Sequence, residues 1–233
     1  MTANDRRLRI LTALGAGAGA EPTPMGVCSA TADLLGAGGA GILVMAEGLP
    51  GAIFASNPLA AGLEELQFTL GIGPRVDAHT LGIPILECDL DAVSAERWVG
   101  FCGAAVEAGA RAVFSFPLRF GAARLGALTI YQPEAGPLDD DVYADALVMA
   151  DVATGALLAA RSGLPDGSLA VGLGDERAFD AGVHQASGMV SVQLDVGVGE
   201  ALARLRARAF AEGIVVGAVA AEVVARRLRF DDR

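Results

Sequence analysis

The sequence has no lysine, only two histidines and three cysteines, and no long hydrophobic run. Cys28, Cys88 and Cys102 are odd in number and lack metal-ligand spacing, so neither a disulfide framework nor a zinc site is expected. His79 and His184 are too few for a histidine-based metal site. We therefore expect a cytoplasmic protein with reduced cysteines and no bound metal.

No segment is expected to cross a membrane. The longest stretch without a charged side chain, residues 48–63, contains Pro50 and Pro58, whereas a spanning helix needs about 20 consecutive apolar residues. Three arginines before residues 10–20 resemble the start of an export signal, but glycines interrupt the apolar part. We interpret this segment as an ordinary amphipathic helix.

Charge is distributed unevenly along the 233 residues. Residues 1–172 carry 9 arginines and 19 acids, whereas residues 173–233 carry 8 arginines and 9 acids. Within residues 201–230 there are six arginines and only two acids, a local net charge of +4. An acidic region followed by a locally basic one is one sign of a nucleic-acid-binding module.

Up to residue 162, helical spacing alternates with short apolar runs. Helices are expected over residues 4–14, 24–35, 58–66, 95–108 and 138–161. Strands are expected over residues 40–45, 52–56, 83–88, 112–119 and 124–131, the first two as a hairpin. This order predicts an α+β domain with an antiparallel sheet flanked by helices, over residues 1–162.

The rest of the chain has a different pattern. Residues 163–172 contain glycine, proline and serine and are interpreted as an inter-domain linker. In the second domain, residues 173–233, helices are expected over residues 177–194, 198–212 and 216–230, each with one apolar face. Three short amphipathic helices with brief connections predict a small all-α bundle.

Four segments of the first domain carry a family resemblance. They are LQFTLGIGPRVDA (66–78), RWVGF (97–101), GARAVFSFPLRFGAARLGALTIY (109–131) and PLDDD (137–141). In order and spacing they resemble the GAF sensor family of actinobacteria. The resemblance implies a pocket for a small-molecule ligand on one face of the sheet.

Aromatic residues near the ends of the expected strands are candidate contacts for that ligand. Phe114, Phe116 and Tyr131 are the tentative pocket residues, with plain core packing as the alternative. The chain has no residue set typical of cyclic-nucleotide or bilin binding, and His79 is expected on a surface loop rather than as a haem ligand. The cofactor or ligand is therefore unassigned.

Two segments of the second domain carry another resemblance. HQASGMVSVQLDVGVGEALARLRARAF (184–210) and VAAEVVARRLRF (219–230) resemble the ANTAR family of transcription antitermination regulators. The resemblance implies a three-helix bundle that binds RNA stem-loops in leader transcripts, generally as a homodimer. Such binding prevents premature termination of the transcript.

Polar and basic side chains on these helices are the candidate RNA contacts. They are His184, Gln185, Ser187, Ser191, Arg204, Arg206, Arg208, Arg226 and Arg229. Uncharged donors and a histidine suit exposed loop bases, and guanidinium groups suit phosphates. The alternatives are a merely solvated face and arginines that only cover the core, and Glu222 is expected to bind Arg226 or Arg229.

The sequence differs from the ANTAR family in two respects. Gly197 and Gly199 stand where relatives usually have a serine cap followed by acids, and Ser187 stands where many have lysine. Glycine is a fair helix cap but a poor interior residue. Fewer phosphate contacts are therefore expected than in those relatives.

Two functions stay open, and neither is catalytic. The chain has no P-loop, no nucleophile with a paired histidine and acid, and no metal-ligand cluster, so we do not expect an enzyme. One hypothesis is a signal-responsive RNA-binding antiterminator. The other is a dimeric sensor whose helical domain docks a protein and no longer binds RNA. We expect the homodimer to use the helix over residues 138–161, which is apolar beyond one face.

Overall fold

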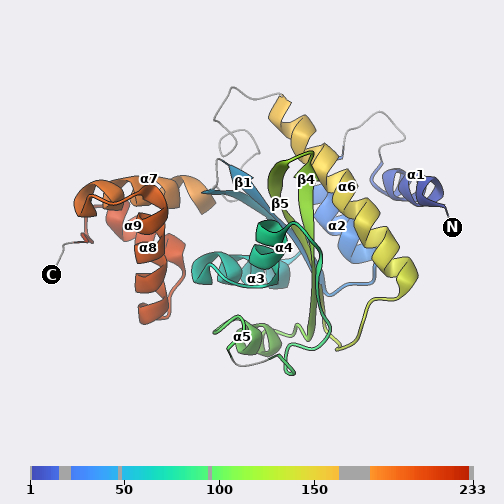
Figure 1. Cartoon of the computed structure of the whole chain (residues 1–233), viewed down its shortest axis with the longest axis horizontal. Helices are drawn as coiled ribbons and strands as arrows, with labels where there is room; N and C mark the ends of the chain where they lie inside the picture. Colours follow the sequence, from blue (N-terminus) through green and yellow to red (C-terminus); the bar gives the residue numbers. More distant parts are fainter. Residues whose placement is uncertain (1, 16–21, 47–48, 94–95, 163–178, 231–233) are drawn as a thin grey trace.

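The computed structural model describes residues 2–15, 22–46, 49–93, 96–162 and 179–230. The expected linker, residues 163–172, lies outside these described residues. A mixed α and β region extends to Ser162, and the described part beyond it is helical (Figure 1).

A five-stranded antiparallel sheet forms the centre of the first region. Its strands are β1 (Gly39–Ala46), β2 (Leu49–Ala55), β3 (Ile85–Glu87), β4 (Ala112–Phe120) and β5 (Ala123–Gln132). Their spatial order is β2-β1-β5-β4-β3, with hairpins joining β1 to β2 and β4 to β5. All five strands expected from the sequence are confirmed, with ends shifted by up to three residues.

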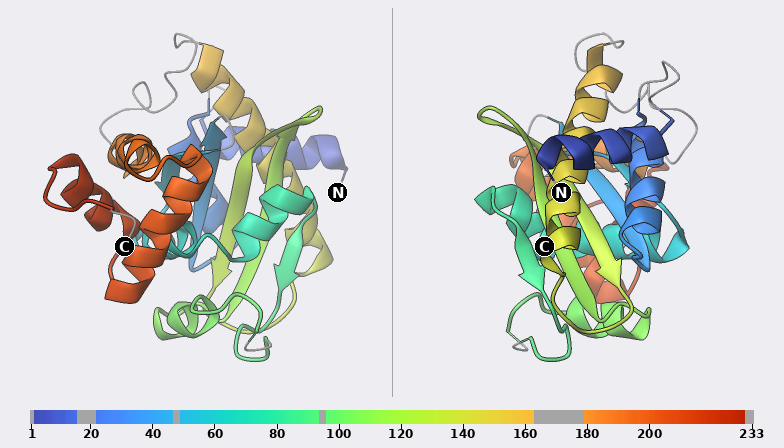
Figure 2. Two further views of the ribbon diagram at one scale, coloured as in Figure 1. Left: turned by 60° about the vertical axis from the view of Figure 1, so that its left-hand side comes forward. Right: turned by 90° about the vertical axis from the view of Figure 1, so that its right-hand side faces the viewer.

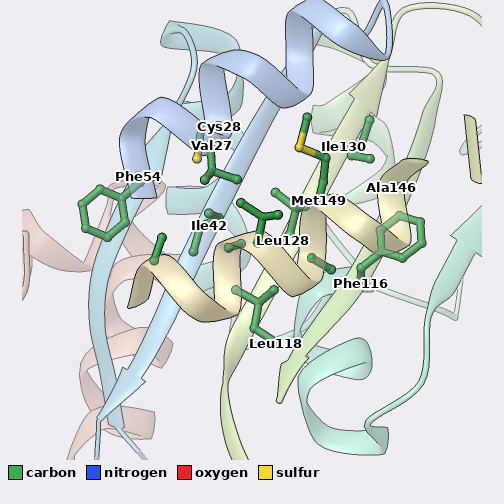
Figure 3. Packing of buried hydrophobic residues seen from close by; sticks show 14 of the residues in the cluster. Val27, Cys28, Ile42, Phe54, Phe116, Leu118, Leu128, Ile130, Ala146 and Met149 are labelled. Carbon is green, nitrogen blue, oxygen red and sulfur yellow. The ribbon is translucent and has the colours of Figure 1, made fainter. Parts of the chain in front are cut away.

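One face of the sheet packs against α2 (Pro24–Leu34) and α6 (Asp140–Ser162). Strand side chains alternate between faces, so Phe116 and Leu118 of β4 and Leu128 of β5 point to the same side. There they meet Val27 of α2 and Met149 of α6 (Figure 3). These large side chains form the main core of the α+β region.

Helix α6 is apolar beyond one face because it has partners within the chain on more than one side. Besides the sheet it contacts α2 and α1 (Ala3–Ala13), and α1 crosses its outer side (Figure 2). Its length and composition would allow it to span a membrane, yet half of that stretch is buried, as in the core helix of a soluble protein. The apolar residues on which the dimer expectation rests are mostly buried inside the chain: Ala150, Val152, Ala153 and Leu157 are buried, whereas Leu147 is 40% exposed.

The opposite face of the sheet is covered by α3 (Pro58–Leu70), α4 (Pro74–Leu81) and α5 (Cys102–Glu107). Asn57 caps α3 by accepting a hydrogen bond from the backbone N of Ala60, and Pro58 follows at the first helical position. Gly71 ends α3 in the left-handed conformation. These local signals explain why α3 begins and ends where it does.

Two expectations in this layer were wrong. The helix expected over residues 95–108 is reduced to Cys102–Glu107, because Trp98 and Gly100 have φ angles of 49° and 83°, which a right-handed helix cannot contain. Conversely, His79 does not lie on a loop but within α4. This eight-residue helix is too short to give a clear period in the sequence.

The C-terminal region consists of α7 (Phe179–Leu194), α8 (Val198–Glu212) and α9 (Val216–Val224), which share one buried cluster. The expected bounds of α8 are confirmed. The third helix was expected to reach residue 230 but ends at Val224, and Arg226 has a left-handed φ of 58°. Residues 225–230 therefore do not continue the helical face.

The helical region packs directly on the α+β region. Phe68 of α3 lies in the same buried cluster as Leu205 of α8 and Val219 of α9. The backbone N of Val216 donates to Thr69 Oγ1 at 3.2 Å, and α7 contacts β2. The end of α3 is thus shared by both regions.

Candidate functional site

A buried polar network lies between the sheet and the helices α3 and α4. The Tyr131 hydroxyl donates to Glu64 Oε1 and accepts from Gln67 Nε2, each at 2.9 Å. Arg75 Nε lies 2.9 Å from Glu64 Oε2, and the Arg75 backbone N donates to Gln67 Oε1 at 2.9 Å. All four side chains are buried, so the network is shielded from water.

Burial dominates the electrostatics of this network. It raises the pKa of Glu64, opposed first by the Arg75 charge and then by hydrogen bonds to its carboxylate. Burial, and after it the Glu64 charge, raise the pKa of Tyr131 well above its usual value, so the hydroxyl stays a proton donor. A buried charge requires a partner, and Arg75 is the partner of Glu64.

Gly41 of strand β1, which has no side chain, leaves the space that the Glu64 side chain occupies. A Cβ at Gly41 would lie 2.6 Å from Glu64 Cγ, closer than real Cβ contacts. Glycine at this position therefore lets a carboxylate sit directly against the sheet.

The sheet separates the three tentative pocket residues. Phe114 and Phe116 lie on the α2 and α6 side, where they are fully surrounded by core side chains. Tyr131 lies on the opposite side, in the polar network. They do not line one pocket, because successive side chains of a strand point to opposite faces of the sheet, and Tyr131 lies on the face away from Phe114 and Phe116.

A cavity of about 230 Å³ lies beside the network, between the α+β region and α8. Its walls come from β1, the end of α3, α4, β5 and α8. The lining residues are Leu43, Met45, Gly71, Arg75, Val76, His79, Thr80, Gly126, Ala127, Gly199, Leu202 and Arg206. Sequence reasoning missed this cavity, because it forms only when α8 docks on the sheet domain.

Arg206 is one wall of this cavity rather than part of an open RNA surface. Its guanidinium carbon lies 5.2 Å from the centre of the Phe68 ring, and its Nε is buried. The structure does not bring Arg206 together with Arg204 and Arg208 on one exposed surface, because the side of α8 that carries Arg206 faces α3.

The polar side chains of α7 that were expected to contact RNA are only partly exposed. Ser187 is 2% exposed, so the expectation of an RNA-facing hydroxyl was wrong at this position. The Ser191 hydroxyl donates to the Val196 carbonyl at 2.5 Å, where the chain turns from α7 to α8. His184 is partly buried, and Gln185 is exposed.

The arginines of α8 that face solvent have local partners. Arg204 pairs with Glu200 at 3.1 Å, and Arg208 pairs with Glu212 at 2.5 Å. Exposed pairs of this kind contribute about 0–1 kcal/mol. The two guanidinium groups can therefore exchange their carboxylates for other anions at small cost.

The C-terminal arginines differ from the expectation in their pairing. Glu222 binds neither Arg226 nor Arg229 but Arg227, at 2.7 Å, and this contact lowers the pKa of Glu222. The reason is that the chain leaves the helix after Val224. Within the described residues, no carboxylate forms an ion pair with Arg226 or Arg229.

Arg226 and Arg229 line a groove of about 550 Å³ together with Gln185. The other lining residues are Gly188, Met189, Val192 and Gln193, all from α7. Val192 is 83% exposed. The sequence signal for this groove, overlooked in the pattern analysis, is apolar Met189 and Val192 on the same helical face as Gln185.

Comparisons with known proteins support the fold of the first region. No protein-family model matches the chain, and no curated protein matches it. Among solved structures, the GAF domain of the Acinetobacter phosphoenolpyruvate-protein phosphotransferase is 13% identical with a TM-score of 0.50, covering 70% of this chain and 98% of that one.

Two further structures are similar at lower scores. The GAF domain of the corresponding Coxiella burnetii protein is 16% identical with a TM-score of 0.49, over 70% of this chain and 98% of that one. A GAF sensor protein from Burkholderia vietnamiensis is 13% identical with a TM-score of 0.46, over 66% and 94%. Taken with the sheet order and its flanking helices, the Acinetobacter match shows that about 70% of the chain has a GAF-type fold.

Proposed function

We propose that this protein is a cytoplasmic, signal-responsive RNA-binding regulator of transcription antitermination. In this proposal the GAF-type domain senses a small ligand, and α7–α9 bind RNA stem-loops in leader transcripts. The ANTAR resemblance of residues 184–210 and 219–230 motivates it. The observation that carries it is the groove in which Gln185, Arg226 and Arg229 meet.

The chemistry of this groove suits single-stranded loop bases next to phosphates. Arg226 and Arg229 are exposed and have no carboxylate partner among the described residues, so their charges are available to phosphates. The Gln185 amide can donate to and accept from a base edge. Met189 and Val192 offer an apolar surface against which a splayed base can pack.

Arg204 and Arg208 form a second basic surface of lower expected affinity. A phosphate must displace Glu200 or Glu212 before it can bind either guanidinium. We therefore expect the groove to contribute more to RNA affinity than the exposed face of α8.

The test is the binding of a two-hairpin leader RNA to the full chain, measured by fluorescence anisotropy at several salt concentrations. The salt slope is the slope of the logarithm of the binding constant against the logarithm of salt concentration. Replacing Arg226 and Arg229 by Ala should reduce its magnitude by roughly 1–2. The matched variant, Arg204→Ala with Arg208→Ala, should reduce it less. Gln185→Ala should weaken binding at an unchanged slope, as for a base contact. A parent protein that binds no hairpin at any salt concentration contradicts the proposal.

A protein-docking function is the second candidate, because the chain also has an apolar groove. This groove, of about 730 Å³, lies where α3 and α5 meet the end of α8. Phe210 is 61% exposed there, beside the exposed Ile214 and Val215. Exposed apolar patches mark interaction surfaces. Under this alternative the parent protein binds no hairpin, and Phe210→Ser should abolish binding of the protein partner.

We further propose that the regulator is a homodimer and not an enzyme. Among the apolar residues of α6, Leu147 remains exposed, and Leu8 of α1 is exposed in the same layer. Light scattering on the full chain should give twice the chain mass, and Leu147→Glu should shift the distribution toward monomer. A monomeric mass for the parent at high concentration contradicts the dimer.

A further inference from the structure

The cavity between the GAF-type domain and α8 contains polar atoms without hydrogen-bond partners. Apart from Arg75 Nε, which forms the ion pair with Glu64, these buried atoms among the described residues are Arg75 Nη2, His79 Nδ1 and Arg206 Nε. Buried polar groups nearly always have partners, so each such atom requires an explanation. Three of them around one cavity are most simply explained by a polar group that binds there.

The electrostatics of the cavity specify the charge of that group. No acidic residue is among the lining residues. Glu64 pairs with Arg75, but no described carboxylate forms an ion pair with Arg206. Burial, and after it the Arg75 charge, lower the pKa of Arg206 to about 10. Burial also lowers the pKa of His79, opposed by a hydrogen bond with the Gly126 backbone and assisted by smaller contributions from Arg124 and Arg75. The site is therefore short of negative charge.

We propose that a small oxyanion, either a phosphate or a carboxylate group, binds between Arg75, His79 and Arg206. The volume of about 230 Å³ lies below the range of about 300–1,000 Å³ typical of drug-sized ligands. The ligand is thus a small acid rather than a nucleotide. This inference rests on the sensing half of the proposed function and gives it a ligand class.

The site couples the two regions because each contributes a cation. Arg75 and His79 come from α4 of the GAF-type domain, and Arg206 comes from α8. An anion that contacts both binds best when α8 is docked, so it shifts the population toward the docked arrangement. The ligand thereby acts on the helices that carry the proposed RNA surface.

The binding test uses the full chain without RNA. Inorganic phosphate and succinate are titrated separately by calorimetry, with chloride at equal ionic strength as the control. We expect one of them to bind with a stoichiometry near one and to raise the melting temperature more than chloride does. The two titrations distinguish a phosphate ligand from a carboxylate ligand. Failure of both oxyanions to exceed chloride overturns the site.

Arg206→Met tests the role of the charge while keeping an apolar stem over Phe68. We expect oxyanion affinity to fall about tenfold or more, whereas the melting temperature without ligand stays equal or rises, because an unpaired cation is removed. Arg204→Met, on the exposed side of the same helix, should bind as the parent does. If Arg206→Met lowers the ligand-free melting temperature and leaves binding intact, Arg206 only supports the fold and the site is refuted.

The outcome is separable from that of the RNA experiment. A protein that binds the oxyanion but no hairpin refutes antitermination alone. A protein that binds the hairpin but no oxyanion refutes this ligand class alone.

Discussion

The GAF-type domain and the helical region differ in how their cores are filled. The cores on the two faces of the sheet contain large aromatic side chains, among them Phe101, Phe116 and Tyr131. In contrast, every buried residue that α7–α9 contribute to their cluster, among those described, is Val, Ala or Leu, with Ser187 as the buried polar exception. The one buried aromatic side chain of that cluster is Phe68, which belongs to α3.

The helical region therefore depends on the sheet domain for part of its core. A small bundle buries a limited fraction of its surface and is marginal alone. Phe68 supplies a large apolar side chain that the three helices lack. The stability of α7–α9 should therefore depend on docking, whereas the sheet domain should be stable by itself.

Replacing Phe68 by Ala should have the largest effect on this dependence. Removing a buried phenylalanine costs about 3–5 kcal/mol of unfolding free energy, and the loss should be greater for α8 and α9 than for α6. Hydrogen exchange of the amides in these helices measures it. The control is Phe210→Ala on α8, an exposed aromatic whose removal should change little. Equal loss of protection in α6 and α8 would show that the two regions unfold as one unit.

Gly41→Ala should destabilise the sheet domain selectively. Its new Cβ would lie 2.6 Å from Glu64 Cγ, and overpacking of this kind costs about 1–3 kcal/mol. Denaturant unfolding measures the loss. The matched control is Gly62→Ala, where nothing lies within 4 Å of the new Cβ and where a helical alanine should stabilise by up to about 1 kcal/mol. Equal stability of the two variants would mean that Glu64 moves aside freely.

Thr69→Val tests a single bond between the regions. It removes the acceptor of the Val216 amide and leaves a buried donor unpaired, at a cost of about 1–2 kcal/mol. Thr69→Ser keeps the hydroxyl and should lose less. Exchange at the start of α9 reports the difference, and protection in Thr69→Val equal to that of the parent would show that this bond contributes nothing measurable.

The smallest effect should come from pH, at the outer helix α1. The Arg6 guanidinium, through a hydrogen bond and its charge, lowers the pKa of Asp141 below its usual 3.8. A lowered carboxyl pKa contributes stability that is present above the unfolded value and is lost as pH falls through the folded value. The protection factors of the α1 amides, which are corrected for intrinsic exchange, should therefore be constant near neutrality and decrease below pH 3.8, and Asp141→Asn should weaken that dependence. The bundle amides of α8 serve as the internal reference.

Local signals predicted the secondary structure where they were strong, and non-local packing decided the rest. Asn57 and Pro58 mark the start of α3, and the acids at residues 139–141 mark the start of α6. Nothing in the sequence marks Trp98 for a left-handed conformation, which prevents the expected helix from starting before Cys102.

The candidate site was less predictable because side-chain exposure depends on docking. The helical period of α7 places Ser187 on the polar side with His184 and Ser191, yet packing of the chain buries it. Similarly, Arg206 borders the apolar face of α8 in any helical projection, but only the approach of α3 turns it into a cavity wall. The groove at Arg226 and Arg229 required the end of α9 at Val224, which no breaker residue marks.

The position of β2 has a consequence for the behaviour of the protein at high concentration. It is one edge of the sheet, whereas the other edge is the three-residue strand β3. Exposed strand edges are templates for pairing between molecules, and short edges are poor ones. Because α7 packs beside β2, undocking of the helical region would open the longer edge. Conditions or variants that release the bundle should therefore promote self-association through β2, so the docked helices also protect the protein against aggregation.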